Sequence, residues 1–131
     1  MSAVIQPSAK EAFLSGSINL SSDTIKAVIV STSYSYSSAH DNYDDVSAYA
    51  ICTPVTLASK SVTNGVFDAA DIAPSDVNGN IGAIIIYKDT GTPSTSRLIA
   101  HIDNMPELPA SISPGTVNVT WDNGSSKIFA L

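Results

Sequence analysis

Short apolar or alternating segments, broken by turn-forming residues about every ten positions, run through most of this chain of 131 residues. Residues 24–30 are rich in β-branched side chains, and residues 116–121 alternate so that Val117, Val119 and Trp121 share one face. No segment keeps a helical period for more than a turn or two, so the crossover helices of a parallel sheet are missing. The pattern predicts an all-β fold, a compact antiparallel β-sandwich or barrel of about seven to eight strands.

Turn signals set the boundaries of the expected elements. Residues 63–65 (Thr-Asn-Gly) predict a hairpin turn, and residues 78–80 (Asn-Gly-Asn) and 122–125 predict further turns. The length fits one domain, so we expect a single all-β domain over residues 10–131 and a short N-terminal arm over residues 1–9. We expect strands over residues 24–30, 46–55, 56–62, 66–67, 81–88, 97–103, 116–121 and 127–131.

Charge and apolar content exclude several classes of partner. The formal net charge is −6, and the six Lys and Arg residues are scattered, so we expect no nucleic-acid partner. No apolar run reaches the ~18 residues of a membrane span, and the N-terminus lacks the features of a signal peptide, so we expect no membrane partner and no export signal. Cys52 is the only cysteine, which excludes an internal disulfide, and we expect it to be a buried apolar side chain.

Residues 81–91 (Ile-Gly-Ala-Ile-Ile-Ile-Tyr-Lys-Asp-Thr-Gly) end in Asp-Thr-Gly, the sequence of the catalytic loop of aspartic proteases. That chemistry needs two carboxylates that share a proton, and a chain of this size would supply the second only as a homodimer. Lys88 stands where those proteases prefer an apolar residue, and Thr-Pro follows Gly91 in place of Ala and a hydroxyl residue. We therefore expect an ordinary strand in which Asp89 opens a turn and Gly91 supplies its conformation.

Other catalytic motifs are missing from the sequence. His40 and His101 are the only histidines, no Gly-x-Ser-x-Gly elbow is present, and we expect both histidines at loops or strand ends. The acidic run from Asp41 to Asp45 leaves two readings open, a weak calcium site or a solvated acidic loop, because it lacks the glycine and the glutamate of an EF-hand loop. That question aside, we predict no enzyme activity, no cofactor and no metal site.

Two segments carry the residues that we expect to bind a partner. Residues 31–45 form a long polar segment with Tyr34, Tyr36 and Tyr43, and a loop of ~15 residues in a compact domain is often functional. The arm carries Val4 and Ile5 among polar residues, a composition suited to a segment that becomes ordered on binding. These five residues are the candidate partner-binding residues, and the three tyrosines are candidates for an aromatic platform.

The order of landmarks along the chain resembles that of a family of small virion proteins from tailed bacteriophages. The resemblance covers roughly residues 10–131 and rests on dispersed structural positions. It carries no catalytic residue. The landmarks are, in chain order, Leu14 and Gly16, residues 22–26 (Ser-Asp-Thr-Ile-Lys), His40 and Asp41, residues 65–71 (Gly-Val-Phe-Asp-Ala-Ala-Asp), residues 87–91, residues 96–100 (Ser-Arg-Leu-Ile-Ala), residues 121–124 (Trp-Asp-Asn-Gly) and residues 127–129 (Lys-Ile-Phe).

The resemblance implies a structural role in the virion, after synthesis in the host cytoplasm. The first expectation is a capsid decoration (cement) protein that stabilises the shell through protein–protein contacts with the major capsid protein or other virion proteins. Such a protein would be a homo-oligomer, a trimer or a hexamer. The alternative is a tail, neck or receptor-binding component of the virion. Two further hypotheses stay open. The chain could be a small enzyme such as a hydrolase, or a β-sandwich module with another role.

Overall fold

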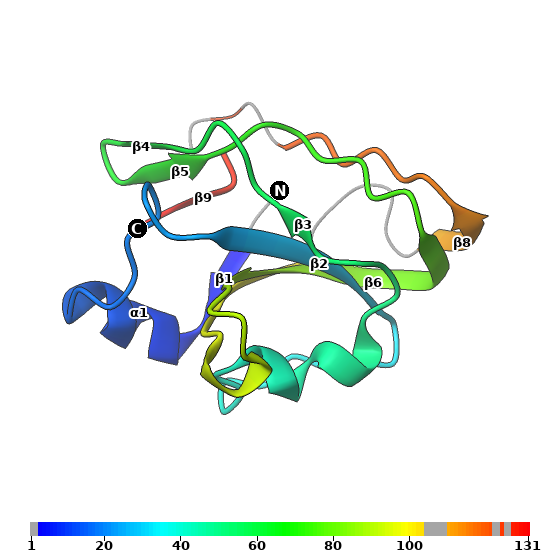
Figure 1. Ribbon diagram of the computed structural model, residues 1–131, viewed down its shortest axis with the longest axis horizontal. Coiled ribbons are helices and arrows are strands. Elements are labelled where there is room, and N and C mark those ends of the chain that lie inside the picture. Colours follow the sequence, from blue (N-terminus) through cyan, green and yellow to red (C-terminus); the bar gives the residue numbers. More distant parts are fainter. Residues whose placement is uncertain (1–2, 104–109, 122–123, 125–126) are drawn as a thin grey trace.

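The computed structural model describes residues 3–103, 110–121, 124 and 127–131, and their arrangement is shown in Figure 1. These residues form mostly antiparallel β-structure, as the sequence predicts, together with one α-helix. The elements are β1 (Ala3–Ile5), α1 (Pro7–Leu14), β2 (Ile25–Ser31), the 3₁₀ helices η1 (Tyr43–Asp45) and η2 (Ser47–Tyr49), β3 (Val55–Thr56), β4 (Ser61–Thr63), β5 (Val66–Asp68), β6 (Val77–Lys88), η3 (Pro93–Thr95), β7 (Leu98–Ile102), β8 (Ala110–Gly115) and β9 (Phe129–Ala130).

Two antiparallel sheets organise the described residues. The larger has six strands in the order β1-β7-β6-β2-β3, with β8 paired to the first half of β6. The smaller has the order β4-β5-β9 and lies over one face of the larger sheet (Figure 1). The larger sheet is open, with β1 and β3 at its two ends, so the arrangement is that of layered sheets and not of a closed barrel.

The central strands β2 and β6 are buried on both faces, and this explains their nearly continuous β-branched sequence. Side chains of successive residues in a strand point to opposite faces. In β2, Ile25 and Ile29 therefore join the core under the smaller sheet, whereas Val28 joins a second cluster on the other face. In β6 the neighbours Ile84 and Ile85 divide in the same way between the two faces.

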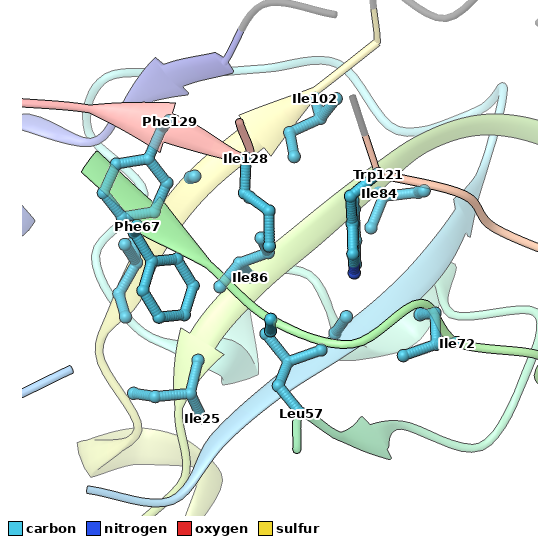
Figure 2. Packing of buried hydrophobic residues seen from close by; sticks show 14 of the residues in the cluster. Ile25, Leu57, Phe67, Ile72, Ile84, Ile86, Ile102, Trp121, Ile128 and Phe129 are labelled. Atoms are coloured by element: carbon cyan, nitrogen blue, oxygen red, sulfur yellow. The ribbon is translucent and has the colours of Figure 1, made fainter. Parts of the chain in front are cut away.

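The first core lies between the two sheets (Figure 2). Phe67 of β5 and Phe129 of β9 come from the smaller sheet, with ring centroids 5.3 Å apart. Trp121 belongs to the same cluster and is 3% exposed. Its indole N–H donates to the carbonyl oxygen of Ala70 at 3.0 Å, and its backbone N–H donates to Asp71 Oδ1 at 2.9 Å. The indole is therefore both packed and hydrogen-bonded.

The second face of the larger sheet is covered by residues 31–50, which we call the covering segment and which includes residues 31–45, the tyrosine-bearing segment that the sequence predicts to be a loop. Its η1 and η2 helices lie on the side of the sheet opposite β4, β5 and β9 (Figure 1). Tyr34 and Val46 are buried there against Val28, Ile85 and other residues of β2 and β6. This segment is thus a third layer of the fold and not a free loop.

Two local predictions are wrong. Residues 78–80 were expected to form a tight turn, but they lie within β6, where Gly79 takes a φ of +133° at a register shift between β6 and β8. Residues 46–55 were expected to form a strand, but they contain η2 and only the first residue of β3. The Asn42 and Asp45 side chains form a reciprocal capping box around η1, which directs the chain into helical turns.

Other expected elements are found with changed lengths. Asn64 and Gly65 both have positive φ and close the two-residue turn between β4 and β5, as predicted. Residues 116–121 alternate in burial as expected, but they are not a strand of either sheet and form one isolated β-bridge, between Ile72 and Val119. Of the predicted turn at residues 122–125, only Gly124 lies within the described residues.

The N-terminal segment differs from the expected free arm. Residues 3–5 pair with β7 as β1, with Val4 opposite His101 and Ile5 opposite Ala100. α1 then begins at Pro7, a residue suited to the first helical position, and buries Ala9. The eight residues of α1 make it the longest helix of the described structure, and no helix there has the length and apolar character needed to cross a membrane.

Candidate functional site

Tyr34 anchors the covering segment to the second face of the sheet. Its side chain is 9% exposed, and its hydroxyl group lies 2.8 Å from Nδ1 of His40. Its ring meets the ring of Tyr49 edge-on, at a centroid distance of 5.3 Å. Burial raises the pKa of Tyr34 to about 12, and the nearby Asp45 carboxylate adds to the effect, so the phenol stays neutral near pH 7.

Gln6 fastens the same segment to the N-terminal part of the chain. It lies between β1 and α1 and is 2% exposed. Its Nε2 group donates to the carbonyl oxygens of Ser37 at 3.2 Å and His40 at 2.5 Å. Its Oε1 atom is buried without a hydrogen-bond partner. A single amide therefore fixes the part of the segment that carries Tyr36 and His40.

His101 lies at the centre of an aromatic cluster. It is the fourth of the five residues of β7, is 7% exposed, and has the rings of Tyr34 and Tyr36 at centroid distances of 5.9 Å and 5.3 Å. Burial lowers the pKa of His101, and the Asp103 carboxylate opposes part of that shift. Within the described residues, neither ring nitrogen of His101 has a hydrogen-bond partner. His101 therefore lies near a strand end, as expected, but its side chain is buried among aromatic rings.

A cleft of about 410 Å³ opens beside this cluster. Its volume lies within the range of roughly 300–1,000 Å³ that is usual for small-ligand sites. Gly82 and Ala83 of β6 form part of its wall. The lining residues are Thr32, Tyr34, Ser35, Tyr36, Gly82, Ala83, His101 and Asp103.

Three of the five candidate partner-binding residues lie around His101. Tyr34 and Tyr36 line the cleft, and Val4 is directly opposite His101 in the β1–β7 pair, so the two side chains share a face of the sheet. Val4 is 47% exposed and Tyr36 is 37% exposed, whereas Tyr34 is buried. The accessible part of the group is therefore Val4 and Tyr36 at the edge of the larger sheet.

The other two candidate residues lie elsewhere. Ile5 points to the opposite face and packs against the core between the sheets. Tyr43 is stacked on Tyr87 of β6, with ring centroids 4.4 Å apart and planes at 8°. Burial raises the pKa of Tyr43. Both side chains therefore hold the fold together, and Tyr43 does not join Tyr34 and Tyr36 in one platform.

Asp89 of the Asp-Thr-Gly sequence lies in an ordinary turn, and its carboxylate contacts residues of that turn and of β2. Its Oδ1 atom accepts the backbone N–H of Gly91 at 3.0 Å, and its Oδ2 atom lies 3.0 Å from Nζ of Lys26. Gly91 has a φ of +88°, a conformation that favours glycine. The Gly91 N–H, followed by Lys26, lowers the pKa of Asp89. These contacts match the turn that we expect from the sequence.

The acidic run and the cysteine also have structural contacts. The Asp45 carboxylate accepts the backbone N–H groups of Asp41 and Asn42, and the first of these contacts is the main cause of its lowered pKa. Within the described residues, no group of three or more metal-ligating side chains is present. The Cys52 sulfur is half-buried and accepts the backbone N–H of Ile29 at 3.3 Å, and burial raises its pKa.

Sequence reasoning missed His101 as the centre of this site, although one signal was present. A histidine between Ala100 and Ile102, inside an otherwise apolar strand, must be placed against polar or aromatic neighbours when it is buried. Comparison with protein-family models finds no model that matches the chain, and comparison with curated proteins finds no significant match.

Proposed function

We propose that the chain is a structural protein of a tailed-phage virion that decorates and stabilises the capsid through protein–protein contacts. The order of landmarks along the sequence is the reason for naming a virion. The structural observation that carries the proposal is the accessible edge at β1, where the exposed Val4 lies opposite His101 and the exposed Tyr36 has its ring 5.3 Å from that histidine. Tyrosine and apolar side chains at an accessible edge are typical of protein–protein interfaces.

Both faces of the larger sheet are covered, and this supports binding of a partner at the edges of the sheet. One face is covered by β4, β5 and β9, and the other by residues 31–50 (Figure 1). Neither face is free to bind a large partner. The strand at one end of the sheet, β1, is only three residues long, which limits uncontrolled edge-to-edge association while leaving apolar side chains accessible.

The carboxylates support a binding role over a hydrolytic one. A general acid needs a raised pKa, as when a carboxyl group is buried in an apolar pocket. Four aspartates of the described structure have lowered pKa values instead, and each accepts hydrogen bonds from nearby groups of a turn or loop. These residues are Asp23, Asp45, Asp76 and Asp89.

The alternative role in the tail, neck or receptor recognition would use an exposed aromatic platform. Tyr34 is buried and Tyr43 is half-buried and stacked against Tyr87, so Tyr36 is the most exposed of the three candidate tyrosines. This arrangement favours decoration over receptor binding. We propose a trimer or hexamer as the bound form, with the major capsid protein as the partner.

Co-sedimentation with undecorated capsids tests the proposal. We expect saturable binding of the full chain, weakened by Val4→Lys and unchanged by Val62→Lys. Val62 is a matched control because it is 51% exposed and lies in β4, in the other sheet. Light scattering of the free protein gives its oligomeric state. Absence of binding would overturn the proposal, and a handful of copies per virion in place of hundreds would favour a tail or neck component.

A further inference from the structure

The ring nitrogens of His101 have no hydrogen bond within the described residues and, since they are not among the buried atoms without a partner, they are open to the cleft. The side chain is more than nine-tenths buried, it lines the cleft, and it has no hydrogen bond within the described residues. Buried polar groups in folded proteins nearly always have a partner from protein, solvent or ligand. A neutral imidazole presents one N–H donor and one acceptor nitrogen, so a bound group with N–H donors would satisfy the acceptor.

The other lining groups set the charge that the cleft accepts. Tyr34 and Tyr36 bring two electron-rich rings to within 6 Å of the His101 ring. Among the described residues that line the cleft, Asp103 is the one carboxylate, and none is lysine or arginine. In ion pairs elsewhere, Lys26 contacts Asp89 and Lys88 contacts Asp23. Aromatic faces beside a carboxylate attract a cation and repel an anion.

We propose that the cleft between residues 32–36 and the end of β7 binds an organic cation, the ammonium or guanidinium group of a partner's lysine or arginine side chain. In this site Tyr36 and Tyr34 contact the cation through their rings, His101 accepts an N–H bond, and Asp103 balances the charge. The inference stands independently of the virion role, because it depends only on the residues that line the cleft.

Other occupants fit the lining less well. An anion would lie beside the Asp103 carboxylate without a lysine or arginine to hold it. A transition metal would use more than one histidine, but Nδ1 of His40 already contacts the Tyr34 hydroxyl group. A neutral sugar would use the hydroxyl groups of Thr32 and Ser35 but would gain nothing from the charge of Asp103. Anion and sugar are therefore the comparison ligands for the test.

The test is a titration of the isotope-labelled full chain, followed by two-dimensional NMR at constant ionic strength. The cationic probes are choline chloride and N-acetyl-arginine amide, and the comparison ligands are methyl glucoside and sodium acetate. We expect saturable shifts of the His101 and Tyr36 resonances with the two cations, with a dissociation constant on the order of 1–10 mM for a lone head group. The comparison ligands should leave these resonances in place.

Matched variants locate the site. We expect Asp103→Asn and Tyr36→Ala each to weaken binding of N-acetyl-arginine amide by about fivefold or more. Asp44→Asn and Val62→Ala should change it by less than about twofold, because Asp44 is an exposed carboxylate and Val62 an exposed side chain of β4, and neither lines the cleft. Absence of shifts at about 50 mM cation, equal shifts with the sugar or acetate, or equal losses in the control variants would overturn the proposal.

Discussion

At the scale of single residues, Trp121 shows how one side chain joins a weakly paired segment to the core. Residues 116–121 meet the rest of the described structure through the bridge between Ile72 and Val119 and a backbone bond from Val117 to Pro74. Such a segment has few ladder bonds, so its position depends on what its side chains bury. Trp121 supplies most of that burial and adds two hydrogen bonds, to Ala70 and to Asp71.

Replacement of this indole should therefore be costly. We expect Trp121→Ala to lower the free energy of unfolding by about 3–5 kcal/mol, through lost apolar burial and the cavity left behind. Chemical denaturation followed by circular dichroism measures the change. Leu14→Ala is the control, because Leu14 is 91% exposed, and it should change the free energy by less than about 0.5 kcal/mol. A loss of less than about 1 kcal/mol in Trp121→Ala would contradict the burial of the indole.

At the scale of elements, the junction between β1 and α1 holds two layers together. β1 extends the larger sheet through β7, and Gln6 reaches across to residues 37–40 of the covering segment. Gly82 lets β6 lie close to the beginning of the covering segment, because a Cβ atom at this position would lie only 2.7 Å from the carbonyl oxygen of Ser31. The covering segment is thus fixed at its beginning by β6 and in its middle by Gln6.

The Gln6 contacts give a prediction for this junction. We expect Gln6→Ala to destabilise the protein by about 1–3 kcal/mol, because the carbonyl groups of Ser37 and His40 lose their buried donor. Hydrogen exchange should quicken first in residues 31–50. Lys10→Ala, on the exposed side of α1, is the control and should alter neither stability nor exchange in that segment. Unchanged exchange in Gln6→Ala would mean that the segment is held without this amide.

At the scale of the whole molecule, two kinds of titratable group control stability in acid. The first is His101, whose pKa is lowered by burial. The second is a set of aspartates whose pKa values are lowered by hydrogen bonds, chiefly from the Asn19 N–H, the Asp41 N–H, the Thr53 hydroxyl group and the Gly91 N–H. The unfolded chain binds protons more readily than the folded chain at all of these groups, so acid favours unfolding.

We expect stability to fall in two stages on acidification. As the pH drops through about 6.5, the unfolded pKa of histidine, the free energy of unfolding begins to decrease because the folded state resists protonation of His101. Below about pH 4 a second decrease follows, as the stabilising carboxylates become protonated in the unfolded and then in the folded state. Denaturation at a series of pH values measures both stages. His101→Gln should remove the first stage and keep the second, and an unchanged first stage would contradict the role of His101.

Local chemistry made part of this molecule predictable. Asn64 and Gly65 specify their hairpin within two residues, and the β-branched residues of β2 specify a strand buried on both faces. Gly79 was misread because glycine with positive φ serves equally in a turn and in a strand with a shifted register. Residues 46–55 were misread because their strand-like composition was outweighed by the capping box of η1.

The candidate site was predictable only in part, because its parts come from distant segments. Tyr34 and Tyr36 were identified from the length and polarity of their segment, and Val4 from its apolar character in a polar context. Their convergence on His101 depends on the register between β1, β7 and β6, which no local sequence pattern specifies. The burial of Tyr34 likewise follows from the packing of one layer on another.

The pairing of β1 with β7 also affects the order in which the strands can pair during folding. Val4 is synthesised near the start of the chain, and its partner His101 leaves the ribosome only after β2 and β6 have emerged. The first strand must therefore wait, with its apolar side chains unpaired, while the centre of the sheet assembles. Folding that depends on contacts so distant in sequence is slow. We expect the local pairings of β4 with β5 and of β6 with β7 to form first and the docking of β1 to be among the last steps, so that an unfinished molecule exposes the sheet edge that the finished one covers.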